Sequence, residues 1–147
     1  MEISLDKRYN IVKQEFVDGE VKQVDFDTGL FFDKTPQALP LYMLFAEKVC
    51  AEYPSVQIKV QKSQIAFSNK HNFAFVWLPI RKMKNRPDIY IVVSFGLPYR
   101  VDSPRIIQAI EPYPNRWTHH AIIKDQNEID TELMDWIKEA RDFAMKK

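Results

Sequence analysis

The chain has 147 residues, 46% of them hydrophobic, a single cysteine and a formal net charge of +1. This composition is typical of one folded domain, and it excludes a disordered chain and an internal disulfide. Because no apolar run reaches the roughly 18 residues of a membrane span and the N-terminus has no signal-peptide pattern, we expect a cytoplasmic protein that does not enter membranes.

The apolar residues among the first 29 residues show no regular spacing. These residues, among them Ile11, Phe16 and Val21, are spaced neither like a helix nor like a strand. The segment is too apolar for a free tail, so we expect residues 1–29 to form an arm that packs on the body of the protein or on a second copy. Residues 30–147 then form a single domain.

Two helices are expected, one on each side of a central β region. The first begins at Thr35-Pro36, where a hydroxyl N-cap precedes a proline, and ends before Pro54. The second runs from near Asp130 to about Met145. Both have apolar residues at helical spacing: Leu41, Leu44, Phe45 and Val49 in the first, and Leu133, Trp136, Ile137, Ala140 and Ala144 in the second.

The region between the helices predicts about five antiparallel strands, at residues 56–60, 65–67, 73–78, 89–95 and 117–124. The prediction is an α+β domain in which this antiparallel sheet carries both helices on one face. Because two of the strands are apolar on both sides, the other face would be apolar too. A ligand, the arm or a second copy would have to cover it. The residues expected there are Ala74, Val76, Leu78, Tyr90 and Val92.

Five short sequences follow one another along the chain: KSQIAF at 62–67, NFAFV at 72–76, DSPRI at 102–106, EPYPNRWTHH at 111–120 and DTELMDWIKEA at 130–140. In this order they resemble the uncharacterised bacterial family catalogued as domain of unknown function 5655, over about residues 30–143. The resemblance implies a small α+β domain and no established activity. Some members carry a Cys/His zinc ribbon before the domain, whereas residues 1–29 here contain neither residue type. The positions that match the family are Lys62, Ser103, Arg105, Glu111, His119 and His120.

The two adjacent histidines cannot act together. Successive side chains of a strand point to opposite faces, so His119 and His120 do not converge on one metal ion, and we expect neither a metal nor another cofactor. His119 shares its face with Trp117 and Ala121, so it is expected to be buried under the helices and hydrogen-bonded. His120 is then on the other face, although a bulge after Trp117 would exchange the faces of the two histidines.

His120 is a candidate general base because histidine titrates near neutral pH. Glu111 is the carboxylate that would orient it, and the pair would make the protein a small hydrolase or transferase. The alternative is that Glu111 caps a turn or pairs with Arg116.

Basic residues are concentrated in the middle of the chain. Residues 1–53 hold 6 basic and 10 acidic residues, residues 54–124 hold 11 and 3, and residues 125–147 hold 4 and 7. This distribution predicts either a surface for an anionic partner or a region that the acidic ends neutralise in the folded chain.

We expect an anionic ligand to contact Lys62, Arg105, Arg116 and His120, with Tyr113 as a stacking platform. Arg105 has an alternative role, a salt bridge with Asp102 or Glu111. The basic loop residues Arg81, Lys82, Lys84 and Arg86 are candidate nucleic-acid contacts. Otherwise they form a solvated loop tip, or they flank the apolar strand that follows and protect it from aggregation.

The sequence therefore favours a binding domain over an enzyme. Its ligand would be a nucleic acid or a small phosphorylated or carboxylated molecule. A homodimeric interaction module without a ligand is the remaining alternative.

Overall fold

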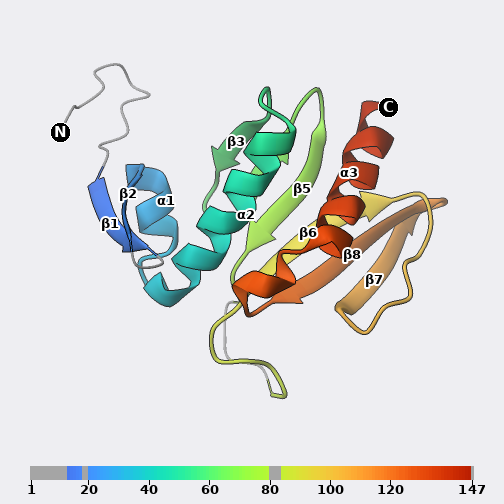
Figure 1. Ribbon diagram of the computed structural model, residues 1–147. Helices are drawn as coiled ribbons and strands as arrows, with labels where there is room; N and C mark the ends of the chain where they lie inside the picture. Colours follow the sequence, from blue (N-terminus) through green and yellow to red (C-terminus); the bar gives the residue numbers. More distant parts are fainter. Residues whose placement is uncertain (1–12, 18–19, 80–83, 147) are drawn as a thin grey trace.

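The computed structural model describes residues 13–17, 20–79 and 84–146. Figure 1 shows its elements, which are in chain order β1 (Lys13–Val17), β2 (Glu20–Val24), α1 (Phe26–Phe31), the 3-10 turn η1 (Pro36–Ala38), α2 (Leu39–Glu52), β3 (Gln57–Val60), β4 (Ile65–Ser68), β5 (Asn72–Trp77), β6 (Ile91–Leu97), β7 (Ile106–Tyr113), β8 (Arg116–Ile123), the 3-10 turn η2 (Gln126–Glu128) and α3 (Thr131–Met145).

The main sheet is antiparallel, with the strand order β3-β4-β5-β6-β8-β7. Helices α2 and α3 cover one of its faces (Figure 1). On that face the ring of Phe45 from α2 packs on Phe67 of β4, and the ring of Trp136 from α3 stacks on Phe95 of β6. The predicted α+β fold with both helices on one face is confirmed, with six strands in the sheet rather than five.

The strand that the sequence pattern missed is β7. It lies at the edge of the sheet and pairs only with β8. Most of its side chains are exposed, so it lacks the apolar–polar alternation of a strand with one buried face. It also contains Pro112, a residue that edge strands tolerate.

Both long helices lie close to their predicted positions. Asp130 is the N-cap of α3, and its carboxylate accepts a hydrogen bond from the Leu133 N–H at 3.0 Å. The start of the first helix differs from the prediction, because the residues after Thr35 form the 3-10 turn η1 and α2 begins at Leu39. The Thr35 side chain makes no capping hydrogen bond.

The segment without a clear period contains regular structure. Strands β1 and β2 pair antiparallel as a separate two-stranded sheet, with Phe16 opposite Val21. Helix α1 follows, and its N-cap Asp25 accepts a hydrogen bond from the Thr28 N–H at 2.7 Å. Residues 1–12 of the expected arm lie outside the described residues, so the packing of the arm stays a prediction.

The expected assignment of side chains to the two faces was wrong for Ala74 and Val76. The register places them opposite Phe95 and Val93, on the face that the helices cover, and both are fully buried. When a strand is apolar on both faces, its sequence does not alternate between apolar and polar residues. The sequence then does not show which side chains point to which face. Because Val76 belongs to the domain's own core, it cannot form a dimer contact on the open face.

The open face has its own buried residues. Phe75, Trp77 and Val92 of β5 and β6 point to it, with Ser94 and His120 beside them. Val92 and Ser94 are only 1% and 3% exposed, whereas the larger side chains of Phe75 and Trp77 are half-buried. Val92 and Ser94 are therefore shielded from solvent by the larger side chains of Phe75 and Trp77.

Candidate functional site

The predicted ligand-binding residues lie at both ends of the sheet. The register places Ile65 and Ile106 in one row across the strands, and Lys62 and Arg105 precede these residues at that end. The pair Tyr113↔Arg116 closes β7 and β8 at the other end.

His120 lies between the two ends, and the loop residues Lys84 and Arg86 precede β6 at the Lys62 end. The structure thus brings Tyr113 and Arg116 together but not the whole set.

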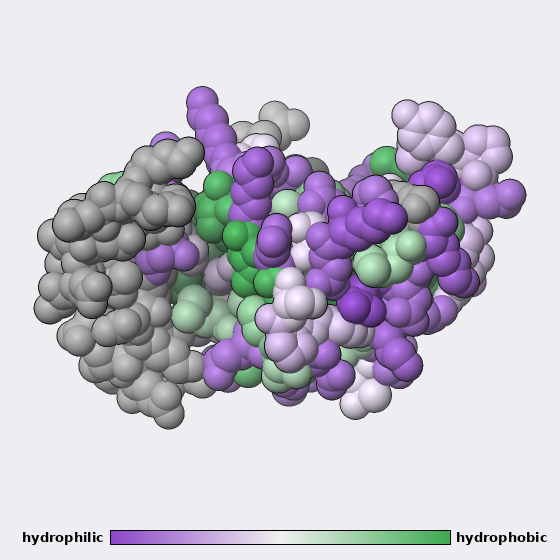
Figure 2. Space-filling model, turned by 90° about the horizontal axis from the view of Figure 1, so that it is seen from above, coloured by the Kyte–Doolittle hydropathy of each residue, from purple (hydrophilic) through white to green (hydrophobic). Residues whose placement is uncertain are grey.

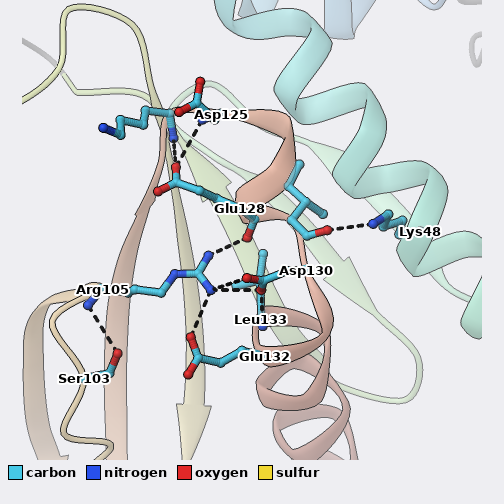
Figure 3. Close-up of polar contacts among 10 residues, drawn as sticks. Lys48, Ser103, Arg105, Asp125, Glu128, Asp130, Glu132 and Leu133 are labelled. Atoms are coloured by element: carbon cyan, nitrogen blue, oxygen red, sulfur yellow. Dashed lines mark hydrogen bonds and ion pairs between the residues drawn. The ribbon is translucent and has the colours of Figure 1, made fainter.

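Arg105 is held by the acidic C-terminal segment (Figure 3). Its Nη1 donates to Asp130 Oδ1 at 2.9 Å and to Glu132 Oε1 at 3.1 Å, and its Nη2 donates to the Glu128 carbonyl. The guanidinium also lies 5.7 Å from the centre of the Trp136 ring. The salt-bridge alternative is therefore the one observed, with Asp130 and Glu132 as partners in place of Asp102 or Glu111.

The same network affects both charged groups. Burial opposes the ionisation of Asp130, but hydrogen bonds from the Leu133 N–H and from Arg105 outweigh it and lower the pKa of this carboxyl group. Burial likewise opposes the charge of Arg105, and its hydrogen bonds to Asp130 and Glu132 raise its pKa. At this position the acidic end of the chain does neutralise the basic middle.

Glu111 and His120 have separate partners. The Glu111 carboxylate accepts a hydrogen bond from the Asn115 N–H at 3.0 Å and so caps the turn between β7 and β8, where Asn115 has a φ of 61°. His120 Nδ1 lies 2.6 Å from Ser94 Oγ, which accepts a hydrogen bond from Trp77 Nε1 at 2.7 Å. The geometry gives His120 a serine and an indole as neighbours instead of the expected carboxylate.

His119 is fully buried under α3, as expected from its strand position. Its ring stacks on Phe95 with 5.2 Å between ring centres, and its Nε2 accepts a hydrogen bond from the Val101 N–H at 2.9 Å. Nδ1 has no hydrogen-bond partner among the described residues. Burial lowers the pKa of His119; the carbonyls of Phe95 and Trp117 oppose that shift without reaching hydrogen-bond geometry.

We expect the free energy of unfolding to fall as the pH drops below about 6.5. Burial lowers the pKa of both His119 and His120 from the ordinary value of 6.5, so in this range the unfolded chain binds protons that the folded chain does not. Urea unfolding between about pH 5 and 8 measures this dependence. His119→Gln, which keeps an acceptor for the Val101 N–H, should show a smaller slope. A wild-type stability that is constant or rises as the pH falls would contradict this reading.

A cleft of about 470 Å³ opens at the Tyr113 end of the sheet. Strand β5 pairs with β6 only as far as Ala74↔Phe95, whereas β6 and β8 stay paired as far as Leu97↔Trp117. The strands β5 and β6 therefore separate at this end, next to the last turns of α3. The residues that line the cleft are His71, Asn72, Phe73, Phe75, Phe95, Gly96, Pro112, Tyr113, Arg116, Trp117, Thr118, Ala140, Phe143 and Ala144.

The cleft is aromatic and contains no acidic residue. Six of its lining residues carry a phenyl, phenol or indole ring, and none is Asp or Glu. The Arg116 guanidinium lies 5.7 Å from the centre of the Phe143 ring, and no carboxylate pairs with it among the described residues. This arrangement provides one cation and several flat apolar surfaces in the same space.

One rim of the cleft is fixed by Arg141 of α3. Its Nε donates to Asn69 Oδ1 at 2.7 Å, and its guanidinium lies 4.5 Å from the centre of the Tyr53 ring. This contact ties the turn between β4 and β5 to α3, and His71 and Asn72 at the end of that turn line the cleft.

Sequence reasoning missed most of the cleft because its walls come from β5, β6, β7, β8 and α3, which meet only in the folded chain. One signal was available, namely Gly96 within an apolar strand, since an isolated glycine in a strand often marks a close approach or an opening. A Cβ at Gly96 would meet only the Trp117 carbonyl oxygen, at 3.9 Å.

A second hollow, of about 330 Å³, lies at the opposite end of the sheet. Arg86 and Lys124 line it together with Arg105, whose guanidinium is already paired. Glu128 also lines it, and its carboxylate accepts hydrogen bonds from the N–H groups of Lys124 and Asp125. Of the candidate nucleic-acid contacts, Arg81 and Lys82 lie outside the described residues. This hollow is less suited to an anion because a carboxylate lines it.

In the described part of the chain, no group of three or more His, Cys, Asp and Glu side chains is placed to hold a metal ion. None of the helices within it combines the length and the apolar character that crossing a lipid bilayer requires.

Comparison with known protein families gives a match over most of the chain. The family whose model matches residues 28–144 is described as Domain of unknown function (DUF5655). The matched range contains every residue that lines the cleft. No curated protein and no solved structure matches the chain. The resemblance seen in the sequence is confirmed.

Proposed function

This chain belongs to the family described as Domain of unknown function (DUF5655), and because that description assigns no activity, we propose its function from the geometry of the cleft. The protein is a binding domain for a small anionic ligand, which occupies the cleft between the β7–β8 turn and the C-terminal end of α3. Arg116 is the residue that binds the anionic group.

The observation that carries this proposal is an arginine in a cleft without carboxylates, for which the described part of the chain provides no counter-ion. Arg105 and Arg141 both form ion pairs, with Asp130 and with Asp142, whereas the Arg116 guanidinium lies against the Phe143 ring and pairs with no described carboxylate. A guanidinium group binds phosphate or carboxylate through two parallel hydrogen bonds. Arg116 is exposed and therefore has these donors available.

An anion in the cleft needs a cation beside it, because the C-terminal end of α3 also borders the cleft. The last carbonyl groups of a helix carry a partial negative charge, and Ala144, in the last turn of α3, lines the cleft. An anion in the cleft would be repelled by this helix end unless a cation lies beside it. Arg116 is the cation that the lining provides.

The placement of three basic residues that the sequence made candidate ligand or nucleic-acid contacts favours a small molecule over a nucleic-acid strand. Lys62, Lys84 and Arg86 lie at the far end of the sheet from Arg116, so they do not extend the cleft into a continuous basic track. The cleft volume falls within the range of about 300–1,000 Å³ that is usual for small-molecule sites.

The test is isothermal titration calorimetry with four small anions: adenosine 5′-monophosphate, ribose 5-phosphate, indole-3-acetate and acetate. We expect at least one to bind, and Arg116→Ala to weaken that binding by at least about tenfold, which corresponds to about 1.4 kcal/mol. Arg86→Ala is the matched control at the other end of the sheet and should leave the affinity unchanged.

A second variant, Gly96→Val, blocks the cleft from a different strand. A Cβ at this position has space in the folded protein, Gly96 lines the cleft, and valine is favoured in strands. It should abolish binding while the protein stays folded. The proposal is overturned if no small anion binds, if a labelled single-stranded oligonucleotide binds when all four fail, or if Arg116→Ala binds as tightly as the wild type.

A further inference from the structure

We infer that the ligand of this cleft is a planar ring system that carries a phosphate or carboxylate group. The inference rests on the proposed function, because it identifies the ligand class of the same site. It excludes purely aliphatic anions such as sugar phosphates without a base.

The first observation is the distribution of the aromatic side chains. Phe73 and Phe95 are 3% and 1% exposed and belong to the core. Phe75, Trp117 and Phe143 are half-buried, and they come from β5, β8 and α3. Rings that are half-buried and line the same cleft leave part of their surface for a ligand, and flat apolar surfaces are the preferred neighbours of a planar ring.

The second observation is Tyr113, which is 67% exposed at the end of β7 yet lines the cleft. An exposed tyrosine beside an apolar cleft supplies a rigid flat surface at a low cost in side-chain entropy. Its position follows from the turn that Glu111 caps through the Asn115 N–H.

The third observation is that the cation and the polar side chains of the cleft lie beside its aromatic rings. Arg116 lies against the Phe143 ring, so the anion-binding group is adjacent to an aromatic surface. Asn72 and Thr118 also line the cleft and offer donors and acceptors to the edge of a heteroaromatic ring. A ligand with a ring and an anionic group on the same molecule uses both kinds of surface at once.

Two matched pairs of probes test the ring requirement. Adenosine 5′-monophosphate is compared with ribose 5-phosphate, and indole-3-acetate with acetate, by isothermal titration calorimetry on the full chain. In at least one pair we expect the compound with the ring to bind at least about tenfold more tightly, since stacking of one ring on an aromatic side chain changes affinity roughly 5- to 150-fold. The pair that shows the difference identifies phosphate or carboxylate as the anionic group.

Variants at Tyr113 provide the control. Tyr113→Leu should weaken binding of the ring compound about fivefold or more and leave the ringless partner unchanged, whereas Tyr113→Phe should bind like the wild type. This side chain is largely exposed, so neither variant disturbs the core. If both members of each pair bind equally well, or if Tyr113→Leu changes nothing, the ring inference is overturned and the proposed function stands. If no probe binds, the proposed function fails, and the inference fails with it.

Discussion

Phe95→Ala is expected to lower the free energy of unfolding by about 3–5 kcal/mol, the usual cost of deleting a buried aromatic side chain. The Phe95 side chain is 1% exposed. Its ring stacks on that of His119, with ring centres 5.2 Å apart, and on that of Trp136, with ring centres 5.6 Å apart. The three rings join β6, β8 and α3, so the cavity left by alanine lies where the helix meets the sheet and cannot collapse without moving α3.

Urea unfolding followed by circular dichroism at pH 7 measures this loss. Tyr113→Ala is the matched control, because it removes a ring that is 67% exposed and should change the stability by less than about 0.5 kcal/mol. A loss below about 1.5 kcal/mol for Phe95→Ala would show that its ring is not enclosed between His119 and Trp136.

Arg105→Met is expected to lower the free energy of unfolding by about 2 kcal/mol. The change removes the hydrogen bonds to Asp130, Glu132 and the Glu128 carbonyl, while methionine keeps the apolar stem in place. The Arg105 side chain is 18% exposed and that of Asp130 is 43% exposed, so solvent screens the pair in part. The expected loss is therefore smaller than the 3–5 kcal/mol of a fully buried ion pair.

A double-mutant cycle isolates this interaction. Asp130→Asn keeps a side chain that can cap α3 but removes the charge. We expect a coupling energy of about 1 kcal/mol between Arg105→Met and Asp130→Asn in urea unfolding, decreasing as salt is added. Fully additive effects would mean that the Arg105–Asp130 pair does not stabilise the fold, and that Arg105 acts through Glu132, the Glu128 carbonyl and Trp136.

The helices and most of the sheet were predictable because their signals are local. The Asp130 cap and the helical spacing of apolar residues from Leu133 to Ala144 define α3 without reference to the rest of the chain. Strand β7 was not predictable in this way, because an exposed edge strand has no buried face to impose alternation. The faces of Ala74 and Val76 depend on their register with β6, which is a tertiary property.

The candidate site was predicted only in part. Tyr113 and Arg116, which were predicted from their chemistry, do line the cleft. Arg105 instead forms ion pairs with Asp130 and Glu132. Sequence proximity gave no information on which end of the sheet a loop occupies, so Lys62 was grouped with residues at the opposite end. The contributions of α3 to the cleft could be seen only once the helix was placed on the sheet.

Neutralisation by the acidic end is observed for one residue of the basic middle of the chain, whereas the surface for an anionic partner stays a prediction. The acidic C-terminal segment pairs with Arg105, which accounts for one of the basic side chains. Arg116 has no such partner among the described residues, and it lies in a cleft without carboxylates. The net charge of the chain therefore does not indicate which arginines are available to an anion. The pairing of each arginine with nearby carboxylates does.

The most direct test of the cleft as the ligand site is a ¹H–¹⁵N correlation spectrum recorded during titration with adenosine 5′-monophosphate. The proposal predicts that the amide signals that move belong to residues lining the cleft, among them Asn72, Gly96, Trp117 and Ala144, and that they stay in place in Arg116→Ala. Shifts centred on Arg86 and Lys124 at the opposite end of the sheet, or no shifts at all, would contradict it.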